Sequence, residues 1–428
     1  MTSFRSEVYQ NEFVTDGANE INAIVTVTAE GVLSSSVAHV GSSGASVELL
    51  VVDCSGSMEG VKLREAKRAT AAAIDAINDG VRFAVIAGSD RAYALYPPDA
   101  RLAESNATSR AAAKDSLRVL RADGGTHIGE WLLAARTLSE QAAGASVHAI
   151  LLTDGRIEGE AYETFVQALD GCEGVFSCDC RGVGTDWEVN ELRRIADKLL
   201  GTVDIVADPE HLAEDFAALM RQSMAKGVAN VALRIWAPQG AEVVFVNQVS
   251  PRVEDITSKA AVSGPLSKDY PTGSWASEAR DYHVCIRVQP GPVGTEKLAG
   301  RASLLVDGEI VSQGLIRVVW TDDAALTTKI DPQVAHYTGQ AELANAIQQG
   351  LEAQKQGDTD VATAKLGRAV QLAKESGNED TMKLLAKVVD VQDADTGTIR
   401  LKRQVELADA MALDTRSTKT VRTKKVGQ

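Results

Sequence analysis

Between residues 46 and 226, short apolar segments alternate with longer segments whose apolar residues recur at helical spacing. The runs ASVELLVVD, VRFAVIAGS and SVHAILLTD have the length and uniform apolarity of buried strands. Each is followed by a helix-like stretch such as GVKLREAKRATAAAIDAIND. Strands joined through helical crossovers run parallel and are covered on both faces. The alternation therefore predicts an α/β fold with a doubly wound, mainly parallel sheet.

The regions on either side of this domain show strand patterning. Residues 1–45 contain alternating runs such as NEINAIVTVTAE, and residues 228–322 contain several strand-like runs separated by turns. The N-terminal strands have no pairing partners of their own. We therefore expect them to complete an antiparallel β-sandwich with residues 228–322, which makes the α/β domain an insertion in that sandwich.

Residues 334–412 are predicted to form a helical hairpin or small bundle. Gly-Asp and Gly-Asn end the first two helical runs, as expected of helix C-termini. There are too few copies for a helical-repeat array. Residues 413–428 are basic and contain almost no apolar side chains, which predicts a disordered tail.

Hydroxyl side chains are interleaved with basic residues in this tail. Basic sequence beside Ser or Thr suits the acidic grooves of many protein kinases, and a phosphothreonine is a ligand for a forkhead-associated domain. A solvated extension that folds back onto the acidic protein is an equally good interpretation. The candidate phosphorylation sites are Thr415, Ser417, Thr418, Thr420 and Thr423.

The net charge and the cysteine content argue against some partners and cellular compartments. The net charge of −15 argues against nucleic acid or an anionic membrane as the partner. No apolar stretch reaches the length of a membrane span, and MTSFRSEVYQNEF lacks the apolar region of a secretory signal. Five cysteines, an odd number, favour reduced thiols, and CEGVFSCDC lacks the second ligand pair of a zinc site. We therefore expect a cytoplasmic protein.

Oxygen-bearing side chains follow the predicted strands at the points where they end. Asp53 and Asp154 each end a strand, Ser55 and Ser57 come directly after Asp53, and two glycines bring Thr126 to the start of a helix. Loops at the carboxyl ends of parallel strands lie at one edge of the sheet, so these side chains can converge. Two carboxylates and three neutral hydroxyls suit Mg²⁺ or Mn²⁺ better than an anionic Ca²⁺ cage.

The pattern Asp53-x-Ser55-x-Ser57, then Thr126, then Asp154 resembles the metal-ion-dependent adhesion site (MIDAS) of von Willebrand factor A (VWA) domains, which have a Rossmann-like fold. The flanking regions resemble a group of bacterial cytoplasmic proteins built around such a domain. The resemblance implies a protein–protein interaction scaffold rather than an enzyme. In that role, a bound divalent ion captures an acidic residue of a partner protein, and no catalytic residue is assigned.

Other functions and site types fit the sequence less well. An accessory subunit of a ring ATPase, resembling the chelatase partners, is the main alternative. A metal-dependent hydrolase is the least favoured, because no general base is evident near the loops. A phosphate-binding P-loop needs a Gly-Lys-Ser/Thr sequence that is absent here. A purely structural interpretation has Ser57 capping a helix and Asp53 accepting backbone hydrogen bonds.

Further polar residues are predicted to be structural. His148 lies inside an apolar strand and is expected to be a hydrogen-bonded core histidine. His127 is expected to point away from the metal-binding residues, and Asp186 to cap the helix that follows it.

Overall fold

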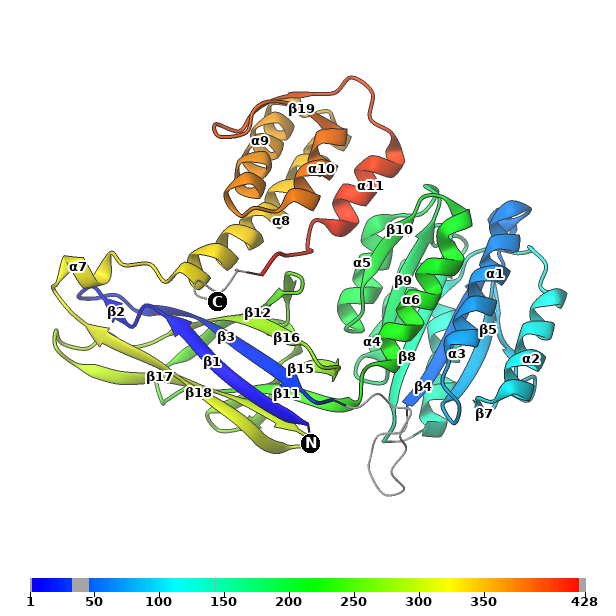
Figure 1. The fold of residues 1–428 in the computed structure, drawn as a ribbon, viewed down its shortest axis with the longest axis horizontal. Helices are drawn as coiled ribbons and strands as arrows, with labels where there is room; N and C mark the ends of the chain where they lie inside the picture. The colour runs from blue at the N-terminus through cyan, green and yellow to red at the C-terminus, as the bar shows by residue number, and fades with distance from the viewer. Residues whose placement is uncertain (1, 33–45, 143, 423–428) are drawn as a thin grey trace. The chain divides into compact units, whose positions relative to one another are not determined.

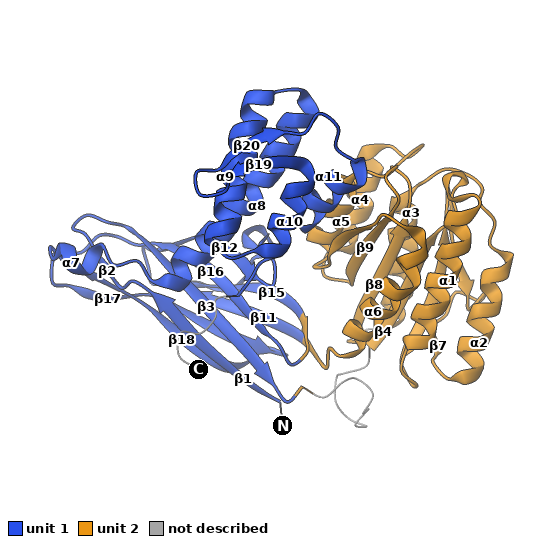
Figure 2. Cartoon of the chain, turned by 45° about the horizontal axis from the view of Figure 1, so that its top comes forward, with its two compact units in different colours: residues 1–31, 230–273, 277–428 blue, residues 32–229, 274–276 orange. Residues whose placement is uncertain are grey.

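The computed structural model describes residues 2–32, 46–142 and 144–422. The chain divides into two compact units, shown in blue and orange in Figure 2. Unit 1 comprises Met1–Gly31, Asn230–Gly273 and Ser277–Gln428, and unit 2 comprises Val32–Ala229 and Ser274–Ala276.

Unit 2 is built on a mainly parallel sheet with the strand order β10-β9-β8-β4-β5-β6 (Figure 1). Strand β4 is central, and it pairs in parallel with β8 on one side and β5 on the other. Antiparallel β6 and β7 both pair with β5. The bounds are β4 Ser46–Asp53, β5 Arg82–Gly88, β6 Ala92–Tyr96, β7 Ala103–Glu104, β8 Ser146–Thr153, β9 Ser177–Val183 and β10 Val203–Val206.

Helices cover both faces of this sheet (Figure 1). Leu50 and Val52 of β4 pack into one apolar cluster with residues of α1 and α6. On the other face, the Trp131 ring of α3 lies against Gly88, where an added β-carbon would come within 2.5 Å of the ring. The helices are α1 Val61–Ala76, α2 Ala107–Ser116, α3 Ile128–Ser139, α4 Tyr162–Cys172, α5 Val189–Lys198 and α6 Leu212–Met224. The predicted doubly wound α/β fold is confirmed.

Unit 1 contains a sheet with the order β1-β3-β16-β12-β13 and another with the order β14-β15-β11-β17-β18-β2. The pairing of β2 with β18 is parallel, and the pairings of β1 with β3, β3 with β16, β16 with β12, β12 with β13, β14 with β15, β11 with β17 and β17 with β18 are antiparallel. The N-terminal strands β1 and β3 join the first sheet through β16. The bounds are β1 Ser3–Gln10, β2 Phe13–Val14, β3 Glu20–Glu30, β11 Val228–Trp236, β12 Glu242–Ser250, β13 Glu254–Asp255, β14 Ala261–Gly264, β15 Ser267–Trp275, β16 Ala279–Arg287, β17 Glu296–Val306 and β18 Glu309–Trp320.

The two sheets pack against each other where glycines leave room. Ile286 of β16 fills the space beside Gly300 of β17, and Val8 of β1 fills the space beside Gly314 of β18. A β-carbon on either glycine would lie 2.4 Å from the facing side chain. The glycines therefore set how closely the sheets approach at these points.

Helices follow the sheets toward the C-terminus. Gly357 ends α8 in the left-handed conformation with φ 81°, and the Asp358 side chain then caps α9. Gly377, with φ 65°, and the capping Asn378 repeat this arrangement before α10. The bounds are α7 Ala324–Thr327, α8 Pro332–Gln356, α9 Thr359–Glu375, α10 Glu379–Val388 and α11 Leu407–Arg416.

A β-hairpin interrupts the region that was predicted to be helical up to residue 412. Strands β19 (Val389–Asp393) and β20 (Thr398–Leu401) pair antiparallel, and Gly397 turns the chain with φ 68°. The β-branched residues Val389 and Val391 favour an extended backbone, and the Asp-Thr-Gly sequence favours a turn. These local signals outweigh the helical pattern that precedes them.

The prediction of a disordered tail from residue 413 is wrong for residues 413–422. Helix α11 extends to Arg416, and Thr415 and Ser417 are each only 3% exposed. Their hydroxyls donate to the backbone carbonyls of Met411 and Asp414. Composition misled the prediction here, because polar side chains whose hydrogen bonds are satisfied locally can be buried at little cost. The candidate phosphorylation sites Thr415 and Ser417 are therefore covered, and Thr423 lies outside the described residues.

The segment after α11 runs beside the end of β12. The amide of Val253 donates to the Thr418 carbonyl at 2.7 Å, and the amide of Thr420 donates to the Pro251 carbonyl at 3.0 Å. Beyond these contacts, Arg422 reaches a carboxylate inside unit 1.

Asp281 of β16 contacts three parts of unit 1 that are distant from it in the sequence. Its carboxylate accepts hydrogen bonds from Thr26 of β3 at 2.5 Å, Tyr337 of α8 at 2.6 Å, and Arg422 Nε and Nη2 at 2.9 and 3.0 Å. The Asp281 side chain is 1% exposed, whereas that of Arg422 is 44% exposed. The arginine therefore supplies the counter-charge of a fully buried acid from near the end of the chain.

Replacing Arg422 with Met is expected to lower the free energy of unfolding of unit 1 by about 1–2 kcal/mol, because Asp281 loses its counter-charge. Because the Arg422 side chain is about half exposed, the loss of unfolding free energy should be smaller than for a fully buried ion pair. Urea unfolding measures the change. Arg317→Met is the control, since its ion pair with Glu296 is exposed at both ends. If both variants lose the same free energy of unfolding, Arg422 is not the counter-charge that stabilises Asp281.

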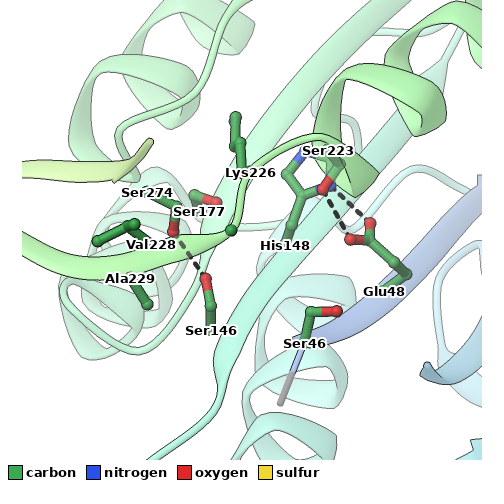
Figure 3. Close-up of a pocket in the computed structure, with 11 residues that line it drawn as sticks. Ser46, Glu48, Ser146, His148, Ser177, Ser223, Lys226, Val228, Ala229 and Ser274 are labelled. Atoms are coloured by element: carbon green, nitrogen blue, oxygen red, sulfur yellow. Dashed lines mark hydrogen bonds and ion pairs between the residues drawn. The ribbon is translucent and has the colours of Figure 1, made fainter. Parts of the chain in front are cut away.

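A charged network is buried in unit 2, and Figure 3 shows its residues Glu48, His148 and Ser223. His148 on β8 hydrogen bonds to Glu48 on β4 at 2.7 Å and to Asp179 on β9 at 3.0 Å. Glu48 also accepts from Ser223 of α6 at 2.7 Å. Burial alone would lower the pKa of His148, but the charge of Glu48 and the hydrogen bond to Asp179 raise it to about 9. His148 is a hydrogen-bonded core histidine, as predicted.

The network predicts that unit 2 loses stability at alkaline pH. The pKa of His148 in the folded state lies above the value of about 6.5 for a free imidazole. Its stabilisation is therefore complete below about pH 6.5 and is lost as the pH rises through about 9, by roughly 3 kcal/mol. Urea unfolding between pH 6 and 9.5 should show this fall in the wild type and a flatter profile in His148→Gln. If the two proteins lose stability identically with rising pH, the His148 network is not the cause of that loss.

Candidate metal-binding site

Backbone hydrogen bonds bring three loops together at the carboxyl end of the unit 2 sheet. The loop after β4 is tied to the loop before α3, because the Gly56 amide donates to the Gly124 carbonyl at 3.0 Å and the Asp123 amide donates to the Cys54 carbonyl at 2.9 Å. The loop before α3 is tied in turn to the loop after β8. Thr126 and Glu158 exchange backbone hydrogen bonds of 3.3 and 3.1 Å.

The oxygen atoms of the first and third loops form a continuous chain. Ser55 Oγ lies 3.0 Å from Ser57 Oγ, and Ser57 Oγ donates to Asp154 Oδ1 at 2.7 Å. Asp53 is held behind them: its Oδ1 accepts from the Ser55 amide at 2.7 Å and its Oδ2 accepts from Thr153 Oγ1 at 2.5 Å.

Thr126 reaches the same place from the second loop. A β-carbon added to Gly155 would lie 3.2 Å from Thr126 Oγ1 and 3.4 Å from Ser57 Oγ. The two hydroxyls therefore flank the space that Gly155 leaves open. The structure thus brings together all five residues predicted from the sequence: Asp53, Ser55, Ser57, Thr126 and Asp154.

The group is buried on one side and open on the other. Asp53, Ser55, Thr126 and Asp154 are each at most 4% exposed, whereas Ser57 is exposed. Burial raises the pKa of Asp53 to about 6, against the opposing effect of hydrogen bonds from Ser55 and Thr153. A nearby cation is what would stabilise the ionised form of such a carboxylate.

The donor set fits a small divalent cation. In an octahedral shell with bonds of about 2.1 Å, adjacent ligand oxygens lie about 3.0 Å apart. The spacings from Ser55 to Ser57 and from Ser57 to Asp154 are 3.0 and 2.7 Å. The purely structural interpretation is wrong about Ser57, because Gly60 is the N-cap of α1 and no side chain caps that helix. Its other half is correct, because Asp53 accepts a backbone hydrogen bond from Ser55.

Sequence reasoning missed Lys62 and assigned the wrong role to Asp186. The Lys62 ammonium lies 2.5 Å from Asp154 Oδ2 and 3.0 Å from Asp186 Oδ2. Helix α5 begins after Glu188 without a side-chain cap, so Asp186 does not cap it. A lysine in the first turn of the helix after the serine loop was the available signal, because that turn faces the site.

Two other residues lie near these loops. Cys54 is buried within the apolar cluster of α1 and α6, and burial raises the pKa of its thiol to about 11. His127 extends toward the loop after β8, where its Nε2 lies 2.7 Å from the β-carbon position of Gly159.

Residues 2–32, 46–142 and 144–422 contain neither a conventional metal-binding cluster nor a membrane-spanning helix. There, no three His, Cys, Asp or Glu side chains are grouped so that they could hold a metal. The candidate site is of a different kind, with two carboxylates and three hydroxyls. Among the described helices, none has both the length and the apolarity needed to cross a membrane.

Comparison with known proteins identifies the class of fold. A family model described as von Willebrand factor type A domain matches residues 49–217, and one described as von Willebrand factor type A C-terminal domain matches residues 371–417. The ArnB paralog VWA2 from Sulfolobus acidocaldarius shares the fold, with a TM-score of 0.62 and 16% identity over 97% of this chain and 98% of that one.

A more similar structure places the chain in a family. It is described as von Willebrand factor type A from Catenulispora acidiphila, with 48% identity, a TM-score of 0.93, and coverage of 98% of this chain and 97% of that one. This chain therefore belongs to the von Willebrand factor type A family. Domains of this family generally mediate protein–protein interaction, often through a divalent metal ion.

Among curated proteins, the uncharacterized protein sll0103 of Synechocystis is 30% identical over 215 residues. That match covers 49% of this chain and 49% of the relative, so the chain spans about half the length of this curated relative.

Proposed function

We propose that this protein captures an acidic side chain of a partner protein at a divalent metal ion. The ion, Mg²⁺ or Mn²⁺, is held by Asp53, Ser55, Ser57, Thr126 and Asp154. The observation that carries this proposal is the convergence of carboxylate and hydroxyl oxygens from three hydrogen-bonded loops.

The chemistry of the donors explains why such a site attracts an acid. Hydroxyl ligands are neutral, so the ion keeps more of its positive charge than it would in an all-carboxylate cage. Ser57 is exposed, so an incoming carboxylate can approach from that side. The buried carboxylates hold the ion, and the partner's carboxylate completes its ligand shell.

Metal-dependent capture is tested by a pull-down in Mg²⁺ and in EDTA. Wild-type protein should retain an acidic partner in Mg²⁺ and release it in EDTA. Asp53→Ala should retain none and should bind Mn²⁺ more than about 100-fold more weakly, since even outer-shell partners of a metal are worth 10–100-fold. Asp90→Ala is the control, because it removes an exposed carboxylate beside the site that is not a proposed ligand. Capture that persists in EDTA would refute the proposal.

A second prediction concerns the open space at Gly155. In Gly155→Ala, the new methyl group lies between Thr126 Oγ1 and Ser57 Oγ and competes with the ion for space. Mn²⁺ affinity should fall by about ten-fold or more, whereas crowding by the methyl group should lower the free energy of unfolding in EDTA by no more than about 1–3 kcal/mol. Calorimetric titration measures the first and urea unfolding the second. Unchanged affinity would show that the ion does not lie between these hydroxyls.

A further inference from the structure

The carboxylate of Asp154 has partners on both of its oxygens. Oδ1 accepts from Ser57, inside the candidate metal site, and Oδ2 accepts from the ammonium of Lys62. The Asp154 side chain is 0% exposed and that of Lys62 is 26% exposed. A single buried acid thus serves the proposed ion on one side and a protein cation on the other.

The ammonium is held in this place by its surroundings. Lys62 belongs to the first turn of α1, whose neighbouring residues Leu63 and Ala66 are buried in the core of unit 2. Its Cε lies 4.0 Å from the β-carbon position of Gly184, and Asp186 binds the ammonium from the exposed side. Lys62 therefore bridges an acid inside the site and an acid at its rim.

A fixed positive charge beside Asp154 has two effects on a divalent ion. The ammonium draws negative charge away from the carboxylate, and it also repels the ion directly. Both effects weaken binding of the ion. The same charge raises the positive potential that an incoming carboxylate meets, so it strengthens binding of that carboxylate to the loaded site.

We propose that Lys62 is a positioning residue that tunes this site. Acting through Asp154, it lowers the affinity for the divalent ion and raises the affinity of the loaded site for the acidic group of a partner. This inference rests on the proposed function. It predicts that metal affinity and carboxylate affinity change in opposite directions when the ammonium is removed, which a merely structural role would not produce.

The test uses the full chain and Lys62→Met, which keeps most of the aliphatic stem and removes the charge. Titration with Mn²⁺, followed by electron paramagnetic resonance of the free ion, should show about ten-fold tighter binding in the variant at low salt. Acetate then serves as the carboxylate probe on Mn²⁺-loaded protein. Acetate that replaces water on the bound Mn²⁺ lowers the relaxation rate of the water protons. This decrease should require about three-fold more acetate in the variant than in the wild type.

Two control variants separate the local charge from the net charge. Lys67→Met removes a lysine from the same helix, but that ammonium donates to the Leu120 carbonyl at 2.9 Å and does not contact Asp154. Its Mn²⁺ affinity should stay within about two-fold of the wild type. Lys62→Arg keeps the positive charge and should also stay close to the wild-type values.

Thermal unfolding in EDTA gives a readout that does not depend on metal. Lys62→Met should unfold at a lower temperature than the wild type, because Asp154 loses its counter-charge, and saturating Mg²⁺ should recover more stability in the variant than in the wild type. If Lys62→Met fails to fold, Asp186→Asn replaces it. That variant leaves the ammonium with Asp154 and should weaken Mn²⁺ binding by about two-fold to three-fold.

The outcomes are distinguishable. Tighter Mn²⁺ binding with weaker acetate binding in Lys62→Met supports the inference. If the wild type binds Mn²⁺ and Lys62→Met binds it equally well or more weakly, the inference about Lys62 is overturned. The proposed metal site is then still supported. If Lys62→Met binds Mn²⁺ more tightly but binds acetate as the wild type does, the inference is also overturned, because the two affinities do not change in opposite directions. Absence of Mn²⁺ binding in the wild type overturns both the proposed function and the inference.

Discussion

The candidate site depends on how Asp53 is held at the carboxyl end of β4. One of its oxygens accepts from the Ser55 amide and the other from the Thr153 hydroxyl, so this carboxylate links the loop after β4 to the end of β8. Because β4 is flanked on both sides by parallel strands, its end is rigid, and the serines that follow are placed relative to that fixed point. The hydrogen bonds of Gly56 to Gly124 and of Thr126 to Glu158 then bring in the other two loops. Burial makes the isolated carboxylate costly, and this is the physical reason that the arrangement favours a cation.

Much of this could be predicted from the sequence, because the signals are local and repeated. Short apolar strands between amphipathic helices identify a parallel sheet, and in such a sheet side chains that follow the strand ends share one edge. Asp53, Ser55, Ser57, Thr126 and Asp154 could therefore be proposed together without coordinates. The same reasoning placed the ends of α8 and α9, where a left-handed glycine precedes a capping Asp or Asn.

Most of the remaining features depend on contacts between residues far apart in the chain. The pairing of Lys62 with Asp186 joins positions more than a hundred residues apart, and neither residue belongs to a motif. Composition suggested that the residues after 413 are disordered, yet the segment is fixed by backbone hydrogen bonds to residues 251 and 253 and by the ion pair of Arg422 with Asp281. The β19–β20 hairpin was missed because its short β-branched stretch directly continues a helical pattern.

The junction at Asp281 has a consequence for how the protein is made. Thr26, Tyr337 and Arg422 meet at the carboxylate of Asp281, so unit 1 cannot complete this junction until residue 422 has left the ribosome. Unit 2, by contrast, is almost entirely one uninterrupted stretch of sequence. During synthesis it can close its core while the first strands of unit 1 still await their partners. In the order of synthesis, Thr26 thus waits for Asp281, which lies 255 residues further along the chain.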